Sequence, residues 1–338
     1  MKTLNIVRRI IIQIFNDKRS LALILIVPVF LFTLIYFLLG DSDYKANIAE
    51  SGIPPLIIES IKDQGLTVSE YSYDEGIDQV NNGKIDAFLY KDDNSIHMVF
   101  KTYDAVKTGV VQKSIANAMK EVSPQGAIQT EYIFGKSGAS MFDSMGYVML
   151  GIVSFFIIFI ISGISFVRER TNQTMERLMM TPVRRWQVVL GYTIGFGFFA
   201  MLQSIILLTY GIMVLNMTVL GSAVTAGFIM ILLAMSAVCI GAFFSIFSNN
   251  EFQMMQFIPV IVIPQIFFSG LITLDTMPYH LGVLSKIMPV YYACSALKTI
   301  MITGGGLEDI WPDISALLLF IVLFFFMNIL ALKKYRKI

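Results

Sequence analysis

A charged block between two apolar segments holds the residues best suited to a specific contact. It runs from Arg168 to Gly191 and reads RERTNQTMERLMMTPVRRWQVVLG. An apolar stripe recurs through it at the i, i+3, i+4, i+7 spacing of one helix side: Met175, Leu178, Met179 and Pro182. Seven charged residues surround the stripe: Arg168, Glu169, Arg170, Glu176, Arg177, Arg184 and Arg185. This pattern predicts a short amphipathic helix at a membrane surface, with ionic groups available to a protein partner.

The same block contains a predicted break. Thr181 is a suitable helix N-cap, and Pro182 would then occupy the first helical position. We therefore expect one short helix, a break, and a second helix that continues into the next apolar segment. Two interpretations remain open, because the short helix could bind a soluble protein that supplies energy or could lie in the interface and only fix the topology.

Other candidate chemical sites are weak. Gly135-Lys136-Ser137 resembles the end of a phosphate-binding loop, but Thr130 stands where such a loop needs its first glycine. The two histidines and two cysteines lack the spacing of metal ligands: His97, His280, Cys239 and Cys294. No nucleophile–base set can be assembled either. We predict no catalytic, cofactor-binding or metal-binding residue, so the chain is not expected to be an enzyme.

The composition is that of a membrane protein. Of the 338 residues, 56% are hydrophobic and 14% are charged, whereas soluble domains are roughly 45–50% apolar and about 25% charged. Six segments are long enough to cross a bilayer: residues 21–40, 144–167, 188–215, 222–247, 254–274 and 313–332. The first segment is too long for a signal peptide and is expected to remain as a helix.

Two stretches outside these spans have distinct compositions. Residues 1–20 are basic and amphipathic, which predicts an interfacial helix. Residues 41–143 carry lysines and acids but no arginine, and their short apolar runs include Pro55–Ile58, Ala87–Tyr90 and Ile96–Phe100. With helical periodicity over 74–82 and 106–122, these runs predict a small α/β domain. The expected fold is mainly α, a polytopic protein with this domain between helices 1 and 2.

The orientation follows from the basic residues. Residues 1–20, the loop 168–187 and the tail 333–337 are all rich in lysine or arginine. With six spans these three segments fall on one side, which the positive-inside rule places in the cytoplasm. The 41–143 domain and the 275–312 segment are then extracellular. The latter holds apolar pieces too short to span, which predicts re-entrant or interfacial helices, or alternatively an apolar surface loop.

The five later spans carry no Asp, Glu, Lys, Arg or His in their interiors. Ion-driven carriers usually place such groups there, so proton coupling is disfavoured, although sodium held by carbonyls and hydroxyls stays open. Any energy is therefore expected to enter through a partner at the cytoplasmic face.

The charged block resembles the first cytoplasmic loop of ABC-2 type transporter permeases, in the subgroup with a large first extracellular loop. Arg168-Glu169-Arg170 matches its start, and Thr174, Glu176, Leu178, Thr181-Pro182 and Gly191 match in order. Gln173 stands where glycine is common in that family, and Tyr192 where lysine is common. A second similarity covers Phe268-Ser269-Gly270, Met277-Pro278, Pro289 and Tyr291-Tyr292, without the usual proline after Ser-Gly.

The resemblance implies half of an ATP-driven exporter in the cell membrane of a bacterium. Its partners would be a cytoplasmic ATP-binding subunit, which binds ATP and Mg²⁺, and a second permease copy or paralogue, with membrane lipids around them and no nucleic acid. Carried over, the residues that form or position the ATPase contact are Glu169, Arg170, Glu176, Arg177 and Pro182. The outer gate would include Met277, Pro278, Pro289 and Tyr292.

The cargo is less defined. If Met255, Phe257, Phe267 and Phe268 line the pathway, a hydrophobic or amphiphilic drug, peptide antibiotic or lipid fits best, as in multidrug resistance. Such residues more often face lipid or pack between helices. The alternatives are a sodium exporter subunit of the same class, and a membrane receptor or scaffold that senses an external ligand through residues 41–143.

Overall fold

The computed structural model describes residues 2–39, 46–92, 95–100, 111, 114–115, 117–118, 141–271 and 278–332. The chain forms two compact units, one made of Met1–Gly40 with Ala139–Ile338 and the other of Asp41–Gly138. They are called here the helical unit and the α/β unit.

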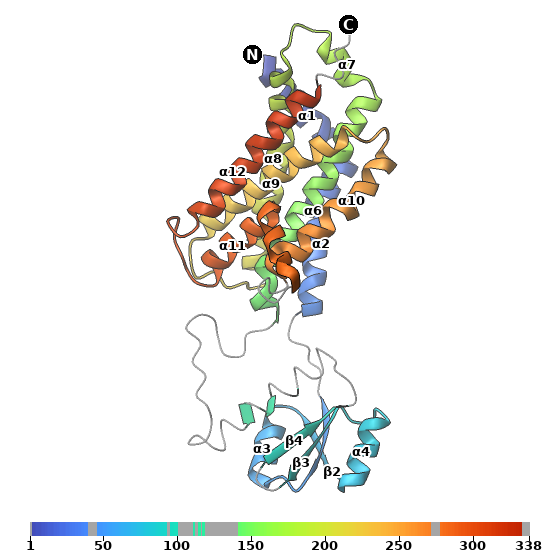
Figure 1. Cartoon of the computed structure of the whole chain (residues 1–338), viewed down its shortest axis with the longest axis vertical. Helices are drawn as coiled ribbons and strands as arrows, with labels where there is room; N and C mark the ends of the chain where they lie inside the picture. The colour runs from blue at the N-terminus through green and yellow to red at the C-terminus, as the bar shows by residue number, and fades with distance from the viewer. Residues whose placement is uncertain are drawn as a thin grey trace. The chain divides into compact units, whose positions relative to one another are not determined.

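Helices make up the helical unit (Figure 1). In chain order they are α1 (Lys2–Asn16), α2 (Lys18–Leu39), α6 (Met141–Thr171), α7 (Thr174–Met179), α8 (Arg185–Met213), α9 (Ala223–Ser245), α10 (Glu251–Ile266) with a π turn over Phe267–Leu271, a 3-10 helix over Pro278–Ile287, α11 (Pro289–Met301) and α12 (Trp311–Ala331). Six helices within the described residues are long and apolar enough to cross a membrane, as predicted. They are α2, α6, α8, α9, α10 with its π turn, and α12.

Burial differs strongly among these six helices. Most of the apolar windows of α6 and α9 is buried inside the unit, whereas little of α2, α10 or α12 is. The largest fully buried side chains include Phe155 and Phe159 of α6 and Phe199 of α8. Helices α6 and α9 therefore form the centre, and the outer helices leave apolar faces that suit lipid or a partner subunit.

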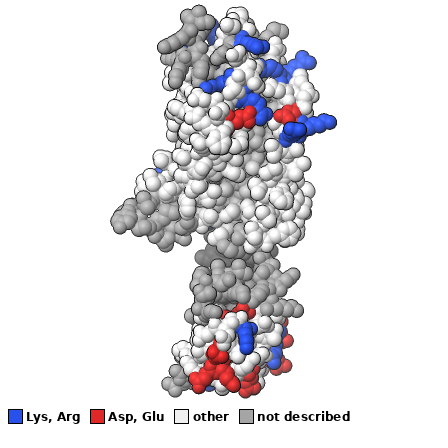
Figure 2. Space-filling model, turned by 90° about the vertical axis from the view of Figure 1, so that its right-hand side faces the viewer, with Lys and Arg blue, Asp and Glu red and all other residues white. Residues whose placement is uncertain are grey.

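Most of the charged side chains of the helical unit that Figure 2 draws gather at one end. Figure 1 places α1, α7 and the last turn of α12 at this end, and α11 at the other. On the face drawn in Figure 2, most of the blue and red atoms of this unit lie at the end of α1 and α7, above a broad white surface. A charged end next to a long uncharged band is what an interface and the adjoining hydrocarbon require.

The second transmembrane helix is longer than expected. The sequence predicts a span over 144–167 followed by a loop, but α6 continues to Thr171. Arg168, Glu169 and Arg170 therefore occupy the last turn of a helix. Arginine in a last turn is favourable there, because it faces the negative end of the helix dipole.

The α/β unit contains a four-stranded sheet in the order β2-β1-β3-β4. Its strands are β1 (Asn47–Ser51), β2 (Thr67–Glu70), β3 (Ala87–Asp92) and β4 (Ser95–Val99). The first three are parallel and β4 is antiparallel to β3. Helices α3 (Pro55–Asp63) and α4 (Tyr73–Asn81) cover opposite faces, since Ile61 packs in a cluster with Ile48, and Val80 packs in another with Ala49. Alternate residues of β1 thus point to different helices.

Part of the strand prediction for this unit is wrong. Ala87–Tyr90 and Ile96–Phe100 correspond to β3 and β4, but Pro55–Ile58 begins helix α3. A proline at the first helical position already has the φ angle that a helix needs, and Ile57, Ile58 and Ile61 then face one side. Strands β1 and β2 were not predicted. Most of the predicted helix over 106–122 lies outside the described residues.

Candidate functional site

Three consecutive residues at the end of α6, Arg168, Glu169 and Arg170, are called here the anchor triplet. Successive helix residues point in directions about 100° apart, so the three side chains reach different elements. Between them they contact α1, α8, the end of α9 and the start of α10. The end of α6, from which α7 follows, is therefore held on several sides.

Glu169 is the buried member of the triplet and is 5% exposed. Its Oε1 accepts a hydrogen bond from Gln13 Nε2 at 2.8 Å. Its Oε2 accepts one from the Tyr192 hydroxyl at 2.7 Å and one from Arg9 Nη2 at 2.9 Å. The Arg9 guanidinium also lies over the Tyr192 ring, 5.6 Å from its centroid. One carboxylate therefore joins α6 to α1 and α8.

Arg168 forms an exposed ion pair. Its Nε and Nη2 atoms donate to the two carboxylate oxygens of Glu251 at 2.9 and 3.1 Å. A second carboxylate, that of Asp17, lies 3.9 Å from Arg168 Nη1. Asp17 also accepts hydrogen bonds from the side chain and backbone of Ser20, which lower its pKa. Exposed pairs contribute little stability, so Arg168 chiefly orients the start of α10.

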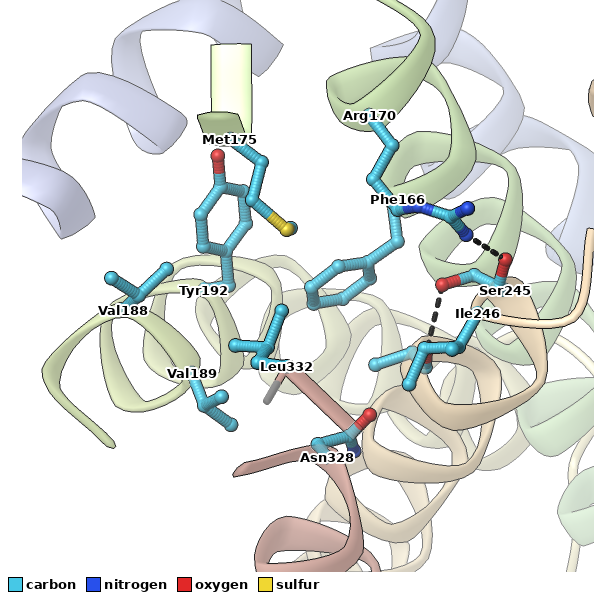
Figure 3. Close-up of a pocket in the computed structure, with 11 residues that line it drawn as sticks. Phe166, Arg170, Met175, Val188, Val189, Tyr192, Ser245, Ile246, Asn328 and Leu332 are labelled. Carbon is cyan, nitrogen blue, oxygen red and sulfur yellow. Dashed lines mark hydrogen bonds between the residues drawn. The ribbon is translucent and has the colours of Figure 1, made fainter. Parts of the chain in front are cut away.

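Arg170 stabilises the end of α9. Its Nη1 atom donates to the carbonyl oxygen of Ser245, the bond dashed in Figure 3, and to that of Ser248 at 3.3 Å. The last carbonyls of a helix lack partners within it and carry its negative dipole. The Arg170 guanidinium gives the carbonyl groups a hydrogen-bond donor, and its positive charge offsets the negative end of the helix dipole.

A cavity lies beside the triplet (Figure 3). Its volume is about 380 Å³ with its open mouth included, and its lining includes Phe166, Arg170, Met175, Tyr192 and Leu332. Figure 3 shows Met175 reaching from α7 toward Tyr192 and Phe166. The first apolar residue of the predicted stripe therefore packs onto α8, which fixes one side of α7 on the helical unit.

Helix α7 has six residues and matches the predicted short amphipathic helix. Met175 is buried, and Leu178 and Met179 are partly buried against the core, while Pro182 is exposed and lies outside the stripe. On the outward side Arg177 is exposed and Met180 is 78% exposed. Arg177 and Met180 are called here the α7 tip.

The predicted role of Thr181 as an N-cap is wrong. Its hydroxyl donates to the carbonyl of Leu178 at 2.6 Å, so Thr181 helps to end α7. Helix α8 begins at Arg185, and the backbone N–H of Arg184 donates to the Gln187 side chain at 2.9 Å. The predicted break before the second helix is present. Pro182 lies within this break and not at the first position of α8, which begins three residues later.

The predicted coupling residues and gate residues lie in different environments. Glu169 is buried and Arg170 is partly buried, and both side chains bond to other helices of the chain, whereas Arg177 and Pro182 are exposed at the end where α7 lies. Of Glu176 only the helical backbone is described. Among the gate residues, Met277 lies outside the described residues, Pro278 begins the 3-10 helix and Pro289 opens α11. The Tyr292 hydroxyl donates to the carbonyl of Lys286 at 2.9 Å, which ties α11 to that helix.

The four expected pathway residues do not share one environment. Met255 and Phe267 are 46% and 51% exposed in the single chain. Phe257 packs against Phe244 with ring centroids 5.7 Å apart, and Phe268 is half-buried. Met255 and Phe267 are thus the more exposed members of the set, and Phe257 and Phe268 are partly buried.

Sequence reasoning missed the partners of the triplet. Arg9 and Gln13 lie four residues apart, beside the buried stripe of Ile6, Ile10 and Ile14 on α1. That spacing places both on one helix face. Two polar residues beside a buried apolar stripe could therefore have indicated a polar contact between α1 and another helix. Tyr192 was noted only as a departure from the family pattern, yet its hydroxyl bonds to Glu169.

Gln173 explains why glycine is common at its position. It has a φ of 56°, in the left-handed region, at the turn between α6 and α7. A residue with a side chain pays roughly 1–2 kcal/mol to adopt this left-handed conformation, whereas glycine adopts it without that cost.

Replacing Gln173 by glycine is expected to raise the free energy of unfolding by up to about 1 kcal/mol, because relief of strain exceeds the entropy that glycine adds to the unfolded chain. Thermal unfolding of the purified protein in detergent measures this change. Asn172→Gly is the control. Asn172 is also exposed and lacks a positive φ, so that variant should lose stability, and equal effects of the two would contradict the strain.

Comparison with known proteins identifies the family. A family profile described as "ABC-2 family transporter protein" matches residues 18–330. The chain is 23% identical over 286 residues to "ABC transporter G family member 20" of Dictyostelium discoideum, covering 82% of this chain and 37% of that protein. It is 26% identical over 162 residues to "Probable multidrug ABC transporter permease YbhR" of Escherichia coli, covering 48% and 44%.

A further relative is "Inner membrane transport permease YhhJ" of Escherichia coli, 23% identical over 182 residues, covering 53% of this chain and 47% of that protein. The chain thus spans less than half the length of these three relatives. The profile match, by contrast, includes all six apolar helices and the anchor triplet. The chain belongs to the ABC-2 family of transporter proteins.

Proposed function

We propose that this chain is the permease half of an ATP-driven exporter. Two permease chains would form the pathway, and a separate cytoplasmic subunit would bind ATP and Mg²⁺ and dock on the α7 tip. The observation that carries the proposal is the contrast between an exposed tip and a tightly held base. Arg177 and Met180 face outward, while the anchor triplet, four to six residues before the start of α7, joins several helices.

This arrangement suits the transmission of movement. A force on α7 would reach α6 directly, α1 and α8 through Glu169, α9 through Arg170, and α10 through Arg168. ATP binding by the partner then needs only to favour one of two arrangements of these helices. Glu169 and Arg170 act here as positioning residues, and Arg177 and Met180 as contact residues.

The orientation and the cargo belong to the same proposal. The basic end with α1 and α7 is placed in the cytoplasm, and the α/β unit is placed outside. The apolar exposed faces of the outer helices favour a hydrophobic or amphiphilic cargo, and one relative is named a probable multidrug permease.

The α7 tip can be tested by the double variant Arg177→Glu, Met180→Asp. We expect binding of the proposed ATP-binding subunit to fall by about tenfold or more, a loss of about 1.4 kcal/mol or more, because charge and apolar contact are both removed at once. Affinity co-purification measures binding, and transport by the assembled complex should fall with it.

A matched control changes the opposite end of the helical unit. Leu307→Asp, Glu308→Lys alters one apolar and one charged residue, both exposed, and should leave co-purification unchanged. Normal subunit binding by the α7 tip variant, or an equal loss in both variants, would contradict docking at the tip.

A further inference from the structure

A carboxamide without a partner is buried inside the helical unit. Gln203 of α8 is 1% exposed, and neither its Oε1 nor its Nε2 atom has a hydrogen-bond partner among the described residues. Burying an amide without a hydrogen bond costs free energy, and most buried polar side chains in proteins have a protein or water partner. A guest or water molecule that both donates and accepts hydrogen bonds would satisfy the Gln203 carboxamide.

Gln203 lines a cavity between α2, α6, α8 and α9. Most of the wall is apolar, with Ile158 and Phe199 among its members, and Ser162 adds one further polar group. The Ser162 hydroxyl donates to the carbonyl of Phe159 at 3.2 Å, which leaves its oxygen lone pairs able to accept. The cavity therefore offers one amide donor, one amide acceptor and one hydroxyl acceptor to a guest.

A second cavity adjoins the first. Both are lined by Ile24, Ile161 and Phe196. The second continues toward the charged end of the unit, where its lining includes Gln13, Asp17, Ser20 and Ser165. Gln203 is eleven residues from Tyr192 on α8, which is about 16 Å along the helix. The linings of the two cavities, which come from α1, α2, α6, α8 and α9, together extend from the charged end to Gln203. The two cavities are called here the groove.

The charged groups along this groove are already paired. Glu169 accepts from Arg9, Asp17 from Ser20, and Arg168 donates to Glu251. A charged guest would have to compete with these contacts and then lose its water beside apolar walls. A neutral guest avoids both costs.

We propose that the groove binds a neutral amphiphile whose deep end carries a hydroxyl or carboxamide group. That group exchanges hydrogen bonds with Gln203 and Ser162, and its alkyl chain lies along Ile24, Ile161 and Phe196 toward the charged end. The cavity also has room for a water molecule, which such a group would displace while reproducing its hydrogen bonds. The proposal concerns binding by this chain alone and does not depend on an ATP-binding partner.

The probe is octan-1-ol with a photoactivatable diazirine, used on the purified full chain in lipid nanodiscs. We expect adducts, located by mass spectrometry, on segments that contain Phe199 or Ile161. Unlabelled octan-1-ol should reduce them and octane at the same concentration should not. Gln203→Met keeps the side-chain volume but removes both hydrogen-bonding atoms, so labelling should fall by about tenfold, the equivalent of about 1.4 kcal/mol.

Ser204→Ala is the matched control. Ser204 is adjacent and buried, and its hydroxyl donates to the carbonyls of Ala200 and Met230, at 2.9 and 3.4 Å. Its labelling should equal that of the unmodified chain. If Gln203→Met is not monodisperse, Ser162→Ala serves in its place with a smaller expected loss. Two results would overturn the proposal and leave only a buried water at Gln203. One is equal labelling of the Gln203→Met variant and the unmodified chain, and the other is equal suppression of labelling by octane and octan-1-ol.

Discussion

Replacing Glu169 by glutamine is expected to lower the free energy of unfolding of the helical unit by about 3 kcal/mol. Three donors converge on the carboxylate, from Arg9, Gln13 and Tyr192. A carboxylate only accepts, whereas an amide brings an N–H₂ group that must face at least one of these donors. Glutamine also removes the charge that offsets Arg9. Thermal or denaturant unfolding in detergent measures the loss.

Glu251→Gln provides the matched control. Glu251 also pairs with an arginine, Arg168, but this pair lies at an exposed site. There the expected loss is below about 1 kcal/mol. Adding Arg9→Met to Glu169→Gln should cost less than the two single changes summed, because the pair shares one network. Equal losses for the two glutamate variants would contradict the buried network.

Replacing Gly191 by alanine is expected to push α1 away from α8. A Cβ atom at Gly191 would lie 2.7 Å from Ile6 Cγ2, and one at Gly195 would lie 2.9 Å from Ile10 Cγ2. Isoleucine in a helix has one strongly preferred χ1 rotamer, so these side chains cannot turn aside freely. We expect a loss of about 1–3 kcal/mol for each change. The proposed export should also weaken, because moving α1 withdraws Arg9 and Gln13 from Glu169.

Gly227→Ala is the control, since the nearest atom to a Cβ there is Leu208 Cδ2 at 3.5 Å, an ordinary contact. That variant should unfold at the same temperature as the unmodified chain or slightly above it. Adding Ile6→Ala to Gly191→Ala frees the space and should restore part of the α1–α8 contact. If Gly191→Ala and Gly227→Ala behaved alike, close packing of α1 on α8 would be refuted.

A charge reversal at Glu169 and Arg170 would not test subunit docking by itself. Both side chains are used inside the chain, so reversal would damage the triplet before any subunit could dock. Loss of export in such a variant would follow from a displaced α6 as well as from a lost contact. The α7 tip variant avoids this ambiguity, because Arg177 and Met180 are exposed.

The six long helices could be predicted because bilayer crossing imposes a length and a composition that a single segment displays by itself. The break between α7 and α8 was likewise visible in local residue types, although Thr181 proved to end the first helix. In the α/β unit, β3 is a short continuous apolar run and β4 carries alternating apolar residues, but β1 and the first turn of α3 do not reveal their type. A short apolar run such as Pro55–Ile58 suits either element until its packing is known.

What the sequence by itself determined is thus the set of membrane helices, the basic segments from which their orientation is predicted, and a short amphipathic helix between the second and third spans. Only the tertiary structure decided which charged residues of the block face outward. Glu169 and Arg9 are 160 residues apart, and Arg170 and Ser245 are 75 apart, so no local pattern could pair them. Their roles depend on how the helices pack, since a carboxylate becomes a buried acceptor only when α1 and α8 bring their donors to it.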